Sequence, residues 1–441
     1  MKWHGCKTCN NRLYVGDMDT VSLAQQFETP LYIVNEERVR SRCREFLHEA
    51  RARWPKSEIA YASKAFCCKA MCALVASEGL HLDVVSGGEM HTALSAGFPP
   101  DRIEFHGNNK SEKELGFAVE NNVGRIIIDS QSELQLLSKV CTKLKKTATI
   151  LIRLNPGVDP HTHASISTGN HDSKFGVPII DKQAITLVKE IANNKYPNTK
   201  LIGFHCHVGS QLLDLEGLGE AANVMVSFAN DVKIATGIEI EELNLGGGLG
   251  IRYLNDHNPP AIGEFFDALL EPAKAAIKKF GLKPPRMVFE PGRSLIGDAG
   301  ITIYEVGAIK ASASGKKFVS VDGGMSDNPR PALYQAKYHA LLANRATENP
   351  TETVCVVGKS CESGDILIPQ IQLPEAQRGD YLAVFSTGAY NYSMASNYNR
   401  LPKPAVVFVM NGKADVVVRR ESLEDITSHD ELPSRFILSR S

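Results

Sequence analysis

The sequence predicts an α/β fold, a TIM-type (β/α)8 barrel followed by an all-β domain, and three observations support it. From about residue 58, short β-branched runs alternate with longer segments whose apolar residues recur at helical spacing. Polar and glycine residues collect at the carboxyl end of nearly every predicted strand, which is where barrels place their active sites. After about residue 296, short strands follow one another without long helices between them, as in all-β domains.

The barrel is predicted from eight strand-like runs and the helical patterns between them. The predicted strands cover residues 58–63, 80–85, 102–106, 125–129, 147–154, 200–208, 241–245 and 286–290. The helical patterns include residues 69–77, 112–120, 132–144, 183–193, 219–235 and 263–280. Eight βα units in sequence indicate a barrel, although a doubly wound open sheet would show the same alternation. The polar strand ends favour the barrel, because closure brings all of them to one mouth.

A chain of 441 residues is too long for one ordinary hydrophobic core, so we expect separate parts. These are an N-terminal segment 1–30 that packs with the β domain, the barrel at 31–295 and the β domain at 296–441. Runs at 12–15 and 31–34 are short strand candidates, and the first is expected to join the β domain. The strands expected within the β domain cover residues 301–309, 317–322, 353–357, 381–386, 405–410 and 414–419.

Charge and cysteine content limit the possible partners and compartments. Lys plus Arg number 49 against 50 Asp plus Glu, without a long basic block, so neither nucleic acid nor a membrane surface is expected as a partner. Apolar runs are too short for a signal peptide or a membrane span, and ten scattered cysteines are typical of reduced thiols, which favours the cytoplasm. Cys6 and Cys9 form a Cys-x-x-Cys pair, but no second pair lies at zinc-site spacing, and we expect no metal.

Lys64 lies where the alternating run 59–62 ends and a helix-like stretch begins at Phe66. A lysine at the mouth of a buried strand is a poor structural choice, because its ammonium group must be desolvated or paired. The position suits an amine that forms a covalent bond with a carbonyl cofactor. We therefore predict that Lys64 is the centre of the chemistry.

Two further motifs follow the seventh and eighth predicted strands, whose loops bind phosphate in barrels. The glycines Gly246, Gly247 and Gly248 let main-chain amides approach an anion, although a tight turn would also explain them. Glu290-Pro291-Gly292-Arg293 places a carboxylate and a guanidinium within one turn of the chain. They form either a structural ion pair or a site in which Arg293 holds an oxyanion and Glu290 keeps a pyridine nitrogen protonated.

His205 and His207 end the sixth predicted strand, and strand alternation sends them to the same face. They could ligate a metal, but no obvious carboxylate or cysteine set completes such a site. A flat imidazole stacked on a flat cofactor fits His207 better, and Ser210 is free to bond the phosphate of that cofactor. His205 is explained equally well as a satisfied core histidine. The loops that hold Cys361, Arg330 and residues 388–394 indicate no function from composition alone.

Together these segments resemble the fold-type III pyridoxal-phosphate decarboxylases. The matching stretches occur in family order over roughly residues 30 to 420, at 61–66, 82–89, 105–111, 205–211, 244–250, 290–295, 322–325, 330–334, 361–365 and 388–399. The resemblance implies that Lys64 carries pyridoxal 5'-phosphate, His207 stacks on its ring, Glu290 pairs with the ring nitrogen and Cys361 returns a proton. The residues implied in cofactor binding are Lys64, Asp83, His207, Ser210, Gly246, Gly247, Gly248, Glu290, Gly292, Arg293 and Tyr390.

The resemblance also implies a homodimer whose active sites are shared, with Cys361 and Glu362 supplied by the partner chain. It is closest to the members that convert meso-2,6-diaminopimelate into L-lysine and carbon dioxide, the last step of lysine biosynthesis. Substrate contacts are then expected from Arg293, Arg330, Tyr334, Glu362 and Tyr390. Arg330 is expected to discriminate against ornithine, which lacks the distal carboxylate. The alternatives are a decarboxylase of another basic amino acid such as ornithine or arginine, an amino-acid racemase on the same barrel, or a non-catalytic cofactor carrier.

Overall fold

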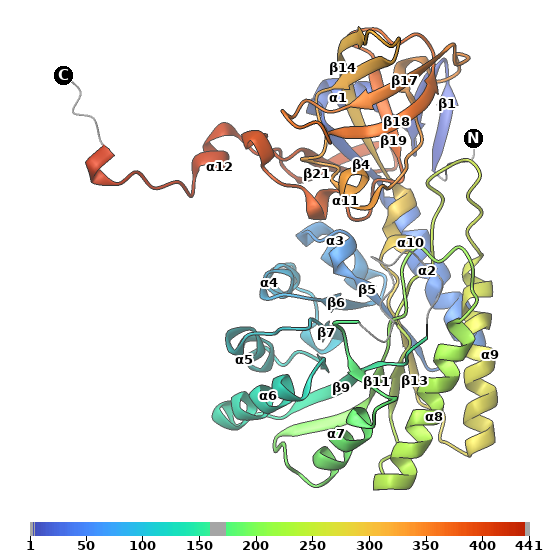
Figure 1. Cartoon of the computed structure of the whole chain (residues 1–441), viewed down its shortest axis with the longest axis vertical. Helices are drawn as coiled ribbons and strands as arrows, with labels where there is room; N and C mark the ends of the chain where they lie inside the picture. Colours follow the sequence, from blue (N-terminus) through green and yellow to red (C-terminus); the bar gives the residue numbers. More distant parts are fainter. Residues whose placement is uncertain (1–2, 4, 159–172, 437–441) are drawn as a thin grey trace.

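The computed structural model describes residues 3, 5–158 and 173–436, and it has a parallel barrel with a β domain above one end (Figure 1). Eight parallel strands form the barrel wall, and β13 pairs with β5 while β8 pairs with β9, so the sheet closes. The predicted (β/α)8 barrel is therefore confirmed. Its strands are β5 (Ser57–Ala62), β6 (His81–Val84), β7 (Ile103–Phe105), β8 (Arg125–Ile128), β9 (Ala148–Asn155), β11 (Thr199–His205), β12 (Glu242–Asn244) and β13 (Arg286–Phe289).

Helices surround the barrel wall in Figure 1 and bury their apolar faces against it. Three consecutive helices, α4, α5 and α6, begin at serine N-caps whose hydroxyl groups accept a hydrogen bond from the third helical residue. These caps fix where each helix starts after the polar end of a strand. The barrel helices are α2 (Glu36–Arg53), α3 (Lys69–Ser77), α4 (Gly87–Ser95), α5 (Glu112–Glu120), α6 (Gln131–Leu144), α7 (Gln183–Ala192), α8 (Leu218–Thr236) and α9 (Ile262–Phe280). A short strand, β10 (Val177–Pro178), extends the sheet beside β9.

The second domain is built on a sheet in the order β18-β17-β15-β14-β4-β20-β21, which confirms the expected β-rich region. The long strand β14 also pairs with β19, and β19 pairs with β16. The strands β16 and β18 were not predicted. The members of this sheet are β4 (Leu31–Asn35), β14 (Gly300–Ala311), β15 (Lys317–Val321), β16 (Ala340–Leu342), β17 (Glu352–Val357), β18 (Ile366–Leu373), β19 (Tyr381–Phe385), β20 (Ala405–Met410) and β21 (Lys413–Val418).

Strand β4 corrects the domain boundary expected at residue 31. It precedes the barrel in sequence, but it lies between β14 and β20 in the sheet of the second domain. All five of its residues are buried, as expected for a central strand. The first barrel element is therefore α2, which begins at Glu36.

The N-terminal segment packs against the β domain without joining its sheet. Strand β2 (Arg12–Val15) pairs only with β1 (Cys6–Cys9) and β3 (Met18–Asp19), in a separate three-stranded sheet of the described chain that is followed by helix α1 (Thr20–Phe27). Leu13 and Val15 nevertheless belong to one buried cluster with Ile301 and Ile303 of β14. Strand β2, which was expected to join the β domain, thus only packs against it. Strand β4 is the one that pairs within the sheet of that domain.

The β domain covers the mouth of the barrel. Val406 and Phe408 of β20 belong to the same buried cluster as the barrel residues, and the Phe408 and Phe66 ring centroids are 6.4 Å apart. Two short helices, α10 (Arg293–Ile296) and α11 (Arg330–Tyr334), carry residues of the predicted site at this junction. Beyond β21 the chain runs away from the body through helix α12 (Leu423–Thr427), as Figure 1 shows. Within the described part of the chain, each helix is too short or too polar to cross a bilayer.

Candidate active site

A cavity of about 580 Å³ lies at the carboxyl ends of the barrel strands, under the β domain. Its size suits a small cofactor together with a small substrate. It brings together most of the predicted site residues, including three from the β domain. The predicted residues that line it are Lys64, Asp83, His207, Ser210, Gly248, Glu290, Gly292, Arg293, Arg330, Tyr334 and Tyr390.

Lys64 lies in the single turn that follows β5, with its side chain open to the cavity. Burial by the surrounding protein lowers the pKa of Lys64, but the charges of Tyr390 and Asp83 raise it by more, so the net pKa lies above its ordinary value. Burial also raises the pKa of Asp83 to about 6. The amine is therefore surrounded by groups that stabilise its protonated form.

Glu290 is held at the end of β13 by three polar side chains, two through hydrogen bonds and His106 through an ion-pair contact. His106 Nε2 lies 2.9 Å from Oε1 of Glu290, His205 Nε2 lies 3.0 Å from Oε2, and Asn244 Nδ2 donates to Oε1 at 2.6 Å. Burial raises the pKa of Glu290, but His106 and His205 lower it by more. The net pKa lies well below the ordinary value of a glutamate. The carboxylate is therefore ionised although it is buried.

The pKa values of the two histidines that hold Glu290 are shifted in opposite directions. Burial lowers the pKa of His106, but Asp83 and Glu290 raise it by more, so its net pKa is raised. Burial lowers the pKa of His205 to about 4. His106 is thus protonated more readily than His205, whose ring is neutral at neutral pH.

His106, His205 and Glu290 also form a set of three possible metal ligands, whose ligand atoms lie within 4.8 Å of one another. The hydrogen bond between His205 and the carboxylate and the close contact of His106 with it account for this geometry without an ion. The pair considered from sequence, His205 with His207, does not converge on one point, because His205 contacts Glu290 whereas His207 contacts the glycine loop.

His207 and the glycine loop form one wall of the cavity. The N–H group of Gly247 donates to Nδ1 of His207 at 3.2 Å, and burial followed by the charge of Lys64 lowers the pKa of His207 well below its ordinary value. Its ring is therefore neutral. A Cβ atom at Gly246 would lie 2.6 Å from the carbonyl oxygen of Cys206, and Gly246 has a φ of +69°. Glycine is required there because the loop runs directly against the end of β11.

Arg293 and Arg330 both contact a buried tyrosine, Tyr253. Arg293 donates to the Tyr253 hydroxyl group at 2.6 Å and to Ser210 Oγ at 3.0 Å. Arg330 lies over the Tyr253 ring, with Cζ 5.1 Å from the ring centroid, and donates to the Tyr338 hydroxyl group at 2.5 Å. Among the described residues, Nε of Arg293 has no hydrogen-bond partner, which leaves a donor for an anion.

Replacing Tyr253 by phenylalanine tests whether this hydroxyl group orders the two arginines. Burial raises the pKa of Tyr253, but Arg293 and Arg330 lower it by more, so it ionises at lower pH than an ordinary tyrosine. A spectrophotometric titration of the protein without cofactor should therefore lose its earliest-ionising tyrosine in Tyr253→Phe. Catalytic efficiency should fall about tenfold, as expected for losing one hydrogen bond to a charged group. An unchanged titration would contradict this assignment.

Cys361, Glu362 and Tyr334 lie towards the outside of the chain. Tyr334 is 39% exposed and lines the cavity at its rim. Cys361 and Glu362 are exposed in the loop between β17 and β18, where the Cys361 N–H group donates to Asn399 Oδ1. Within a single chain, the structure does not bring these two residues into the cavity. Their predicted contribution from a partner chain stays a prediction.

Four site residues were not assigned a role from sequence. His106 and Arg153 line the cavity. Both lie at the ends of strands, so their positions could have indicated that they belong to the site. Asn244 begins the glycine motif, but its hydrogen bonds reach residues far away in sequence. Tyr253 lies in an irregular loop, where no periodic pattern indicates which way a side chain points.

A closed barrel with a lysine, an ionised buried carboxylate and an arginine-lined cavity at its mouth defines a class of cofactor-dependent barrel enzymes. The family described as "Pyridoxal-dependent decarboxylase, pyridoxal binding domain" matches residues 36–297. The chain belongs to this family.

Curated and solved relatives match nearly the whole chain. The diaminopimelate decarboxylase of Bacillus subtilis is 46% identical over 97% of this chain and 97% of its own length. A crystal structure of diaminopimelate decarboxylase from M. jannaschii has a TM-score of 0.92 at 35% identity, covering 98% of both chains. A second structure of that enzyme, in complex with L-lysine, also has a TM-score of 0.92, at 34% identity over 98% of this chain and 99% of its own.

Proposed function

We propose that this protein is a carboxy-lyase that uses pyridoxal 5'-phosphate to convert meso-2,6-diaminopimelate into L-lysine and carbon dioxide, the last step of lysine biosynthesis. One observation carries the proposal: a single cavity contains Lys64, the ionised Glu290, and the two arginines Arg293 and Arg330. Relatives with 41–46% identity over nearly the full length are diaminopimelate decarboxylases, and a solved one binds L-lysine, the product of this reaction.

The residues of the cavity fit the chemical groups of pyridoxal phosphate. Lys64 supplies an amine for the aldehyde, and Glu290 supplies an ionised acceptor for a protonated ring nitrogen. Ser210, the amides of the glycine loop and the unpartnered Nε of Arg293 supply donors for the phosphate. His207 offers a neutral ring for stacking beside Lys64.

Each of these residues then has a task in the reaction. The bound cofactor supplies an electron sink for the electron pair that is left when the substrate carboxylate departs as carbon dioxide. Glu290, whose pKa is lowered by His106 and His205, would keep the ring nitrogen of the bound cofactor protonated. Lys64 would hold the cofactor through its aldehyde, and its amine would be the group that the substrate amine replaces. Cys361 of a second chain returns one proton to the carbon that lost its carboxylate.

Arg330, Tyr334 and Glu362 are explained as contacts of the distal end of the substrate, away from the cofactor. Diaminopimelate carries an amine and a carboxylate there, and a buried arginine can hold that carboxylate. Burial lowers the pKa of Arg330, but Tyr253 and Tyr338 raise it by more, so the side chain stays charged. Tyr334 lies on the same helix, α11, and Glu362 would receive the distal ammonium group. A decarboxylase of ornithine or arginine is not favoured, because those substrates have no second carboxylate. A racemase is not favoured, because relatives with 41–46% identity are decarboxylases.

A turnover assay with meso-diaminopimelate, ornithine and arginine side by side tests the function. Carbon dioxide release and L-lysine formation are expected from meso-diaminopimelate, with far slower release from the other two. Conversion of meso-diaminopimelate into its stereoisomers without carbon dioxide would support the racemase instead. Bound cofactor with no turnover of any substrate would support the carrier.

We also propose a homodimer with shared sites, supported by the position of Cys361 and Glu362 outside the cavity of their own chain. Coexpression of a Lys64→Ala chain with a Cys361→Ala chain is the test. Mixed dimers then contain one native site, so activity should recover to about a quarter of the native value if the chains pair at random. The control is Lys64→Ala with a chain that carries both substitutions, which leaves no native site. Equal inactivity of both mixtures would contradict sharing.

We place the enzyme in the cytoplasm. All ten cysteines carry free thiols, including Cys67 and Cys72, which lie within hydrogen-bonding contact of each other. Unoxidised neighbouring thiols fit a reducing compartment. Cell fractionation should recover the enzyme with cytoplasmic markers, and recovery with secreted or membrane-bound proteins would refute this location.

A further inference from the structure

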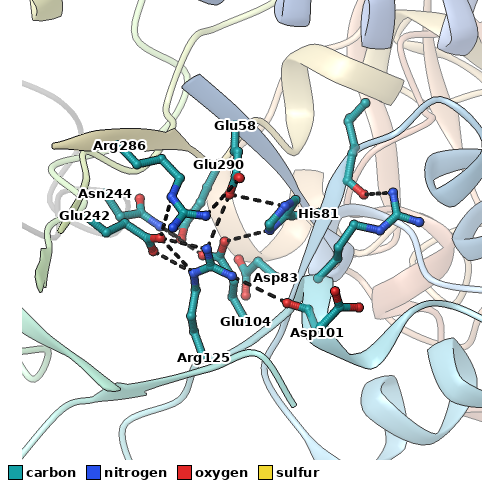
Figure 2. Close-up of polar contacts among 12 residues, drawn as sticks. Glu58, His81, Asp83, Asp101, Glu104, Arg125, Glu242, Asn244, Arg286 and Glu290 are labelled. Carbon is teal, nitrogen blue, oxygen red and sulfur yellow. Dashed lines mark hydrogen bonds and ion pairs between the residues drawn. The ribbon is translucent and has the colours of Figure 1, made fainter. Parts of the chain in front are cut away.

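Asn244 lies at the end of β12 with its side chain fully buried and all its hydrogen-bonding groups in use. Its Nδ2 atom donates to Glu290 Oε1 at 2.6 Å and to Glu104 Oε2 at 3.1 Å, and its Oδ1 atom accepts from the Gly246 N–H group at 2.9 Å. Figure 2 shows this amide between the two carboxylates. One side chain thus contacts both the carboxylate and the glycine loop of the proposed cofactor site.

Glu104 connects Asn244 to a layer of charged residues inside the barrel, which Figure 2 also shows. Glu104 is completely buried, and its Oε1 atom lies 3.5 Å from Nδ1 of His81. His81 in turn contacts Glu58, and Glu58 forms an ion pair with Arg286 at 3.0 Å. Glu104, His81, Glu58 and Arg286 all lie outside the lining of the cavity, and Asn244 donates hydrogen bonds both to Glu104 of this layer and to Glu290.

An amide is required at this position for a chemical reason. Only an amide offers two donors and one acceptor on a short side chain, whereas serine offers one donor and aspartate offers one only when it is protonated. Two buried carboxylates repel each other unless donors lie between them. Asn244 supplies those donors, and it fixes the direction in which Glu290 points.

From this geometry we infer that Asn244 is a positioning residue of the decarboxylase. It holds the Glu290 carboxylate in the position from which it would meet the ring nitrogen of the cofactor, and it links that carboxylate to the glycine loop proposed to bind the phosphate. The inference rests on the proposed function. It adds a residue that does not itself touch substrate or cofactor.

Asn244→Asp is the sharpest test, because aspartate has the same shape and keeps an acceptor for Gly246 while it cannot donate to both carboxyl groups at once. The turnover number should fall about 10- to 100-fold with a smaller change in KM, as for other residues that orient a catalytic group. Pyridoxal phosphate should bind more weakly to the apoenzyme, and the visible absorbance of the bound cofactor should titrate with a shifted midpoint. The matched control is Glu58→Gln, which alters the charged layer without touching Asn244 and should leave all three measurements close to native.

A double variant keeps the test decisive if Asn244→Asp does not fold. Combining Asn244→Asp with Glu104→Gln exchanges the carboxylate and the amide, so the new amide at position 104 can donate to the new carboxylate at position 244 and the net charge is unchanged. Its thermal stability should approach the native value while its turnover and absorbance titration stay altered. Native turnover and titration in either variant, or the same changes in Glu58→Gln, would overturn the inference. Failure of the native apoenzyme to take up pyridoxal phosphate would instead refute the proposed function.

Discussion

Replacing Lys64 by alanine is expected to lower turnover by about 10³-fold or more, the largest effect of any single substitution proposed for this enzyme. In the proposed function the amine of Lys64 carries the cofactor and exchanges with the substrate amine, a task for which we expect no other side chain to substitute. Asp83, Tyr390 and Glu290 raise the pKa of Lys64 against the effect of burial, and alanine removes the cation that these groups surround. Steady-state turnover of meso-diaminopimelate measures the effect.

The control for Lys64→Ala is Lys337→Ala, because Lys337 is a second lysine that lines the same cavity. Lys337 is exposed, and its replacement should leave turnover within a few-fold of native. Mass spectrometry after borohydride reduction should find the cofactor adduct on Lys64 in the native protein and in Lys337→Ala. An adduct on Lys337, or on any residue of the Lys64→Ala protein, would refute the central role of Lys64.

The barrel and the centre of the site could be predicted because they depend on local patterns. Strand alternation ends at Lys64 and Glu290, and parallel closure brings strand ends together whatever the intervening residues are. Pairing between distant segments was harder to predict. The sequence of Leu31–Asn35 indicates a buried strand, but no local pattern indicates whether that strand joins the barrel or the sheet of the second domain.

Irregular elements account for the other differences. Strand β18 contains Pro369 and lies at the edge of its sheet, where the pairing with β17 shifts in register. Such a strand lacks the alternation on which sequence prediction depends. Tyr253 and Asn244 were missed for a related reason, because their importance lies in hydrogen bonds across the barrel mouth. The roles of Cys361 and Glu362 depend on a second chain and stay predictions.

Replacing Arg330 by alanine is expected to remove the preference for a substrate with a distal carboxylate. A charge-assisted hydrogen bond contributes about 1.5–3 kcal/mol, so catalytic efficiency on meso-diaminopimelate should fall by about 10- to 150-fold. Catalytic efficiency on ornithine should fall much less, since ornithine has no distal carboxylate for Arg330 to bind. Steady-state kinetics on both substrates gives the ratio of the two catalytic efficiencies, and the cofactor content of each protein is measured in parallel.

Arg330→Lys is the matched control, because it keeps the charge and loses the flat guanidinium that lies against Tyr253 and Tyr338. It should retain part of the preference for meso-diaminopimelate, whereas alanine should retain almost none. Equal losses on both substrates in Arg330→Ala would indicate that Arg330 only supports Tyr253 and Arg293. Unchanged catalytic efficiency on meso-diaminopimelate would mean that another group binds the distal carboxylate. Arg153 would then be the next candidate, because it is another largely buried arginine that lines the cavity.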